Sequence, residues 1–116
     1  MPIREQKQQL FKMQADICKT MSDPKRLMIM HELRNGELSV GQLSAQLELP
    51  QANVSQHLAI MRKRGIVSTR REGTTVYYSL ASCKIGEACD MVRDVLNEQL
   101  SNTRELAALL NKSRGR

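Results

Sequence analysis

The sequence predicts a mostly α-helical (α+β) fold in which helices are followed by one small β-hairpin. Amphipathic helical patterns cover residues 5–35 and 82–100, and residues 66–80 contain two β-rich runs separated by a glycine-containing turn. Between them, residues 40–64 form two short helical patterns around a tight turn. Two such helices followed by a hairpin constitute a winged helix-turn-helix, an arrangement that reads duplex DNA. The length corresponds to one domain, which we assign to residues 1–116.

The first two predicted helices cover residues 5–21 and 23–35. The first carries an apolar stripe that is broader than a small monomer needs, formed by Leu10, Phe11, Met13, Ala15, Ile17, Cys18 and Met21. Asp23 can cap the second helix, with Pro24 at its first helical position and Gly36 after its end. Its inward-facing residues are expected to be Leu27, Met30 and Leu33.

Residues 40–64 form the predicted helix-turn-helix, and residues 37–39 lead into it as a short connection or a minor strand. In the first helix, Leu43 and Leu47 face inward. The second helix starts at Pro50 and buries one side through apolar residues at i, i+4 and i+7, namely Val54, Leu58 and Met61. This leaves amides, a hydroxyl and an imidazole near its N-terminal end: Gln51, Asn53, Ser55, Gln56 and His57. Such groups recognise base edges, so we expect this helix to read the major groove.

Basic residues end the reading helix and form the tip of the predicted wing. Arg62, Lys63 and Arg64 occupy the last helical turn, where they favour the helix dipole and can contact phosphates before Gly65 ends the helix. The wing spans residues 66–80, with strands over 66–69 and 75–80 and a turn whose tip is Gly73. From this wing we expect DNA contacts by Arg70, Arg71 and Thr74.

Residues 82–100 form a long final helix that Ser82 can cap. Its apolar stripe consists of Ile85, Cys89, Val92, Leu96 and Leu100. Together with the stripe of residues 5–21, it predicts a two-fold homodimer built on the N- and C-terminal helices, with two reading helices about one DNA turn apart. Residues 101–112 either continue this helix or start another at Asn102, which with Glu105 resembles a capping box. Residues 111–116 form a basic tail with an auxiliary electrostatic role.

Composition favours a nucleic-acid partner and argues against several other classes. Eighteen Lys and Arg against twelve Asp and Glu give a net charge of +6, which favours a polyanion such as double-stranded DNA. Aromatic residues make up only 3%, too few for a platform that stacks single-stranded bases. Because the sequence shows no long apolar run and no secretory leader, we expect a cytoplasmic protein without membrane association. It also shows no nucleophile–base pair or phosphate-binding glycine loop, so we do not expect an enzyme.

Several spaced motifs resemble the ArsR/SmtB winged-helix repressors over residues 8–98. In order, they are residues 23–27 (DPKRL), 37–40 (ELSV), 54–58 (VSQHL), 71–73 (REG) and 76–78 (VYY). The resemblance implies a homodimeric transcriptional repressor that sits on a promoter and is released when an effector binds. It also implies that the DNA contacts fall on the reading-helix residues named above, with support from Arg70 and Arg71.

The resemblance does not extend to the metal sites of that family. Arsenic- and cadmium-type members carry a thiolate pair in an ELCVCDL motif, where this chain has ELSVGQL at residues 37–43. Zinc-type members carry Asp-x-His and His-x-x-Glu in the final helix, and the matching positions here are Ser82, Lys84, Val95 and Glu98. Since His31 and His57 lie in separate helices, no imidazole cluster replaces these ligands, and no metal is expected at either site.

Three cysteines, Cys18, Cys83 and Cys89, remain as candidates for an effector site. Their odd number and irregular spacing indicate reduced thiols. Cys83 would lie in the first turn of the last helix beside unpaired N–H groups, which makes it the best candidate for a reactive thiol, whereas Cys18 and Cys89 fit packing positions. If that helix starts late, the sulfurs could gather around an arsenite-like soft ion. The family branch that senses reactive sulfur or oxidants uses a second-helix cysteine, whose place His31 or a neighbour holds here.

Two other interpretations of the winged helix stay open. One is an effector-independent or architectural DNA binder in which all three cysteines belong to the core. The other is a winged helix that docks a protein, for which the basic wing and the salt concentration would matter little.

Overall fold

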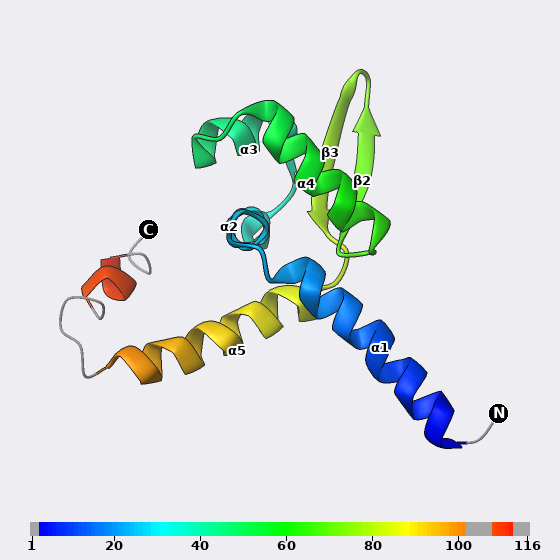
Figure 1. The fold of residues 1–116 in the computed structure, drawn as a ribbon. Helices are drawn as coiled ribbons and strands as arrows, with labels where there is room; N and C mark the ends of the chain where they lie inside the picture. Colours follow the sequence, from blue (N-terminus) through cyan, green and yellow to red (C-terminus); the bar gives the residue numbers. More distant parts are fainter. Residues whose placement is uncertain (1–2, 102–107, 113–116) are drawn as a thin grey trace.

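The structure is a computed structural model that describes residues 3–101 and 108–112, and it is a winged helix-turn-helix (Figure 1). Its α-helices are α1 (Ile3–Met21), α2 (Pro24–Glu32), α3 (Val40–Leu47), α4 (Gln51–Lys63) and α5 (Cys83–Leu100), and a 3₁₀ turn, η1 (Leu33–Asn35), follows α2. The strands are β1 (Leu38–Ser39), β2 (Val67–Glu72) and β3 (Thr75–Leu80). The mostly helical class with one small sheet is therefore confirmed. None of the described helices is long and apolar enough to cross a membrane.

The helix starts follow local capping chemistry. The Asp23 carboxylate accepts hydrogen bonds from the N–H groups of Lys25 and Arg26 at 2.9 and 3.2 Å, as predicted, and Pro24 takes the first helical position. These N–H groups, the one of Arg26 first, lower the pKa of Asp23. Ser82 caps α5 by accepting from the N–H of Lys84 at 3.2 Å, which confirms the second predicted cap.

The two ends of the chain could be predicted less well. The last helix stops at Leu100, and Ser101 is a turn residue, so the alternative of an uninterrupted helix is wrong at this point. Residues 108–112 are helical again. The predicted capping box at Asn102 and residues 113–116 of the basic tail lie outside the described residues.

The sheet is antiparallel with the strand order β1-β3-β2. The connection over residues 37–39 contains the minor strand, because Leu38 pairs with Tyr78 and Ser39 with Tyr77. The predicted turn over residues 70–74 is too long, since β2 extends to Glu72 and pairs with β3 as far as Thr75. A two-residue turn suffices here because Gly73 adopts a positive φ of 61°, which closes the hairpin tightly.

One core joins α2, α3, α4 and the base of the wing. Its buried apolar residues are Ile29, Met30, Leu33, Leu43, Val54, Leu58, Met61, Ile66 and Val67. Leu27, predicted to face inward, is 40% exposed in one protomer, and Ile29 takes the buried place in α2. The helical spacing in α2 allowed both choices, and packing against α4 selects the face with Ile29.

The N- and C-terminal helices leave the core in different directions and do not cover each other (Figure 1). On α5, Ile85 and Cys89 pack against the core, while the residues beyond them project outward. The exposed apolar residues of these two helices include Leu10, Phe11, Met13, Ile17, Met91, Val92, Val95 and Leu96. Apolar surface of this extent needs a partner, as the sequence pattern predicts.

Candidate nucleic-acid interface

Helix α4 buries one side and exposes the other. Val54, Leu58 and Met61 are fully buried, which confirms the predicted packing stripe. On the exposed side lie Gln51, Ser55 and Gln56, three of the five predicted reading residues, while Asn53 is half-buried. The exposed side therefore offers a hydroxyl and amides to whatever lies against it.

His57, the fifth predicted reading residue, lies in a different environment. At 100° per residue it projects roughly 60° from the centre of the buried stripe, on the flank of α4 and away from Ser55. Its side chain is half-buried, and its Nδ1 accepts a hydrogen bond from Nε of Arg26 in α2 at 3.1 Å. The prediction that His57 shares the reading face is therefore wrong. A helical wheel could have placed it on the flank, but nothing local identifies Arg26 as its partner.

The basic end of α4 is arranged as predicted. Arg62, Lys63 and Arg64 are all exposed, and the helix ends because Gly65 adopts a positive φ of 75°. The N–H of Gly65 donates to the Arg62 carbonyl at 3.0 Å, which satisfies one of the last helical carbonyls. Three cationic side chains thus lie at one end of the exposed face.

The two wing arginines lie on opposite faces of the sheet. Since side chains alternate along a strand, Arg70 shares its face with Glu72 and with its cross-strand neighbour Tyr77. Arg71 shares the other face with Val67, which belongs to the core side of the sheet. Helix α4 lies on that side, so Arg71 and α4 belong to the same surface (Figure 1). Thr74 is exposed in the two-residue turn.

The guanidinium of Arg70 is already engaged. It donates to the Glu37 carboxylate from Nε at 3.1 Å and from Nη2 at 2.5 Å, and from Nη1 to Glu72 at 3.0 Å. It also lies 4.9 Å from the centre of the Tyr77 ring. The hydrogen bond from Arg70 lowers the pKa of Glu37, and the two carboxylates raise the pKa of Arg70. This geometry does not support the predicted phosphate contact of Arg70, which instead ties the wing to the segment before β1.

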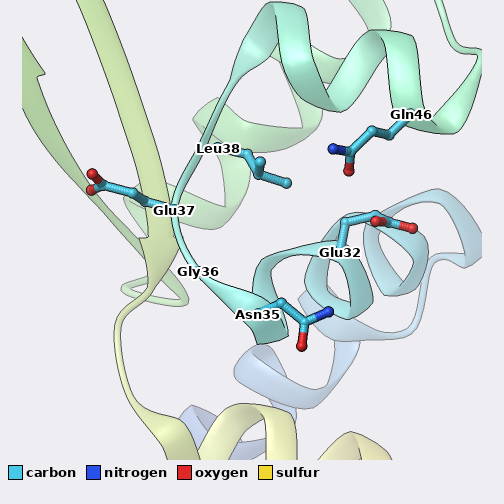
Figure 2. Close-up of a pocket in the computed structure, with 6 residues that line it drawn as sticks. All are labelled: Glu32, Asn35, Gly36, Glu37, Leu38 and Gln46. Atoms are coloured by element: carbon cyan, nitrogen blue, oxygen red, sulfur yellow. The ribbon is translucent and has the colours of Figure 1, made fainter.

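A cavity of about 350 Å³ opens beside this segment, between η1 and α3. Figure 2 shows Glu32, Asn35, Leu38 and Gln46 around it, whereas the Glu37 carboxylate points away from it, in agreement with its bonds to Arg70. Among the described residues, no group of three His, Cys, Asp or Glu side chains is placed to hold a metal ion.

The three cysteines are free thiols in the structure. Cys83 is the first residue of α5, next to the cap of Ser82, and is exposed, whereas Cys89 is partly buried. Burial, and then the charge of Asp90, raise the pKa of Cys89. Because Cys83 is helical, the alternative of a late-starting helix is wrong, and about 9 Å of rise separates it from Cys89. Cys18 is exposed on α1, which corrects its predicted packing role within one protomer.

Comparison with known proteins agrees with this geometry. The family model described as "Bacterial regulatory protein, arsR family" matches residues 23–69. The transcriptional activator HlyU of Vibrio cholerae is 48% identical over 69 residues, a match that covers 60% of this chain and 64% of HlyU. The uncharacterized HTH-type transcriptional regulator Rv0081 of Mycobacterium tuberculosis is 37% identical over 94 residues, which cover 80% of this chain and 82% of Rv0081.

Solved structures extend the likeness over most of the chain. The structure of Rv0081 superposes with a TM-score of 0.73 at 36% identity and covers 80% of this chain and 94% of its own. The homodimeric winged helix-turn-helix DNA-binding domain Mb0332 of Mycobacterium bovis superposes with a TM-score of 0.77 at 27% identity, covering 88% of this chain and 93% of its own. The chain therefore belongs to the ArsR family of bacterial regulatory proteins.

Proposed function

We propose that this protein is a homodimeric, DNA-binding transcriptional repressor that binds an operator and leaves it when an effector is captured. The observation that carries the proposal is the exposed side of α4, where Ser55 and Gln56 lie away from the buried stripe of Val54 and Leu58. A hydroxyl and an amide in this place can bond base edges in the major groove. Such a regulator acts in the cytoplasm, where its unpaired thiols stay reduced.

Support for the dimer comes from the uncovered apolar sides of α1 and α5. Leu10 is 62% exposed and Val92 is 70% exposed in one protomer, which a stable isolated chain would not maintain over two whole helices. A two-fold axis lets both helices bury these sides at once and presents two copies of α4 to one face of DNA. Mb0332, with the same fold, is described as homodimeric.

The dimer is tested by sedimentation of two variants with the same change in charge. Leu10→Glu places a carboxylate on the apolar side of α1 and is expected to give monomers that no longer bind the operator. Gln8→Glu lies about 200° away around the helix and is expected to remain dimeric. A dimeric Leu10→Glu variant would contradict an interface built on α1.

Operator binding is tested with the duplex upstream of the protein's own gene against a random duplex. Gln56→Ala is expected to reduce the preference for the operator, by about 1–3 kcal/mol for each base that the amide no longer bonds. Arg71→Ala is expected to weaken binding to both duplexes and to flatten the salt dependence by about 0.9 per phosphate, or about 1.8 for the dimer. Arg70→Ala is the charge-matched control, and because its guanidinium is held by Glu37 and Glu72 it should leave the salt slope unchanged.

For the effector we propose a thiol-reactive agent, such as an arsenite-like soft ion, reactive sulfur or an oxidant, that acts first at Cys83. The support is its exposure at the N-terminus of α5, on a helix that the proposed dimer interface includes. Modification there is expected to shift α5 and to change operator affinity by about 5–150-fold. Cys83→Ser should bind the operator normally and lose the response, with Cys18→Ser as the control. A Cys83→Ser variant that still responds would contradict this role.

Two alternative functions predict different outcomes in the same assays. An effector-independent DNA binder would bind the operator with no response to any thiol reagent. A protein-docking winged helix would bind neither duplex specifically, and Arg71→Ala would leave its function unchanged.

A further inference from the structure

Arg26 lies where α1, α2 and α4 meet, and it contacts all three. Its backbone N–H donates to the capping carboxylate of Asp23 at 3.2 Å, within the first turn of α2. Its Nη1 donates to the Thr20 carbonyl of α1 at 3.2 Å, and its Nε donates to Nδ1 of His57 in α4 at 3.1 Å. The planar guanidinium fixes the angle between these last two bonds. One side chain therefore links the last turn of α1 to the middle of α4.

The bond to Thr20 satisfies a helix end that is otherwise incomplete. The last four carbonyls of an α-helix have no partner within the helix, and Thr20 is the next-to-last residue of α1. Thr20 is 6% exposed, so water cannot readily replace the missing partner. Its hydroxyl is held in turn, donating to the Asp16 carbonyl at 2.8 Å. Arg26 thus anchors the end of α1 at a buried position.

The bond to His57 fixes the state of the imidazole. An arginine can only donate, so Nδ1 of His57 must accept, and the neutral ring then carries its proton on Nε2. The ring lies on the flank of α4, between the buried stripe and the exposed side. His57 is therefore placed to join α4 to α2 and α1, and its remaining N–H points elsewhere than at Arg26.

We infer that Arg26 is a positioning residue that locks α1 to α4 through His57 and so sets the spacing of the two reading helices in the dimer. The inference rests on the proposed function, because it concerns how the dimer meets DNA. Figure 1 shows that α1 leaves the core from its C-terminal end, where Thr20 lies, so a small change of angle there becomes a large displacement along the helix. If α1 forms the dimer interface, this angle determines how far apart the two α4 helices lie.

The first test is the tautomer of His57, measured by ¹⁵N NMR of the imidazole in the DNA-free protein. The wild-type ring is expected to show an unprotonated Nδ1 and a protonated Nε2. Arg26→Gln should change this pattern to a mixture of both tautomers, whereas Lys25→Gln should not, because Lys25 contributes its backbone N–H to the same cap. An unchanged ring in a folded Arg26→Gln protein would overturn the link.

The second test is operator spacing, with duplexes in which the half-sites are moved by one base pair in either direction. Wild type and Lys25→Gln should prefer the natural spacing by at least about 5-fold, the lower end of coupling between linked sites. Arg26→Gln should lose this preference while it remains dimeric and binds a single half-site as before. Arg26→Lys, whose one ammonium cannot reproduce the two-way fork, should give an intermediate preference if Arg26→Gln proves too unstable to assay.

The results separate this inference from the proposed function. A retained spacing preference in Arg26→Gln overturns the positioning role while operator binding stands. If the wild-type protein binds no duplex specifically, the proposed function fails and the spacing role fails with it, and the NMR experiment still decides whether Arg26 sets the state of His57.

Discussion

The contact between α5 and η1 gives a prediction whose sign depends on a single arginine. Gly86 is buried in α5 because the Arg34 side chain lies across it. A Cβ atom at Gly86 would lie 2.7 Å from Cζ of Arg34 and closer still to Nη1 and Cδ. The same guanidinium pairs with the carboxylate of Asp90, one turn further along α5. Gly86→Ala therefore cannot be accommodated unless Arg34 moves away.

The expected magnitude follows from two opposing effects. Alanine is favoured over glycine inside a helix by about 0.5–1 kcal/mol. Moving Arg34 sacrifices an ion pair whose partners are 31% and 54% exposed, a class of pair worth about 0.2–1 kcal/mol, together with the packing of its methylene groups on α5. In the wild-type background Gly86→Ala should therefore be neutral or destabilising, and in an Arg34→Ala background it should stabilise by the full helix-propensity amount.

The assay is a double-mutant cycle by urea unfolding of the wild type, both single variants and the double variant. All four must be compared at one protomer concentration, because the stability of a dimer depends on concentration. We expect a coupling free energy of about 1 kcal/mol between Gly86 and Arg34, within the range for residues in contact. Equal stabilisation by Gly86→Ala in both backgrounds would refute the argument that Arg34 requires a glycine beneath it.

Two further predictions concern the core and the wing. Leu58→Ala removes a fully buried side chain of α4 and should lower the free energy of unfolding by about 2–5 kcal/mol, measured by urea denaturation, whereas Gln56→Ala on the exposed side should change it little. Glu37→Gln tests the bond to Arg70, which lowers the pKa of Glu37 below its ordinary value of 4.5. A depressed carboxyl pKa stabilises the fold above that value and the contribution is lost as pH falls through the folded-state pKa, so Glu37→Gln should be less stable than wild type near pH 7 and should match it in acid. A stability difference that stays constant from neutral to acid pH would contradict this assignment.

The features that depend on neighbours in the chain could be predicted from the sequence. Asp23 and Ser82 cap their helices as expected, because a cap needs only a side-chain oxygen and the two or three residues that follow. The predicted turn over residues 70–74 is too long because charged residues are poor indicators of strand, although β3 pairs with them as far as Glu72.

The contacts that position the candidate interface join residues far apart in the chain, and no local pattern reveals them. Arg26 and His57 are 31 positions apart, Glu37 and Arg70 are 33 apart, and Arg34 and Asp90 are 56 apart. In the sequence, each arginine looks like one more surface charge. The fold converts all three into connections between elements.

The division of labour between the two wing arginines has a consequence for how this family can diversify. Because Arg70 is bonded to Glu37 and Arg71 faces the side of α4, the two positions answer to different constraints. Across relatives, positions 37 and 70 should change together, an acid with a base or both replaced at once, since an unpaired partner would leave the wing loosely attached. Position 71 should instead vary with the operator that each relative recognises, so that neighbouring arginines follow separate evolutionary histories.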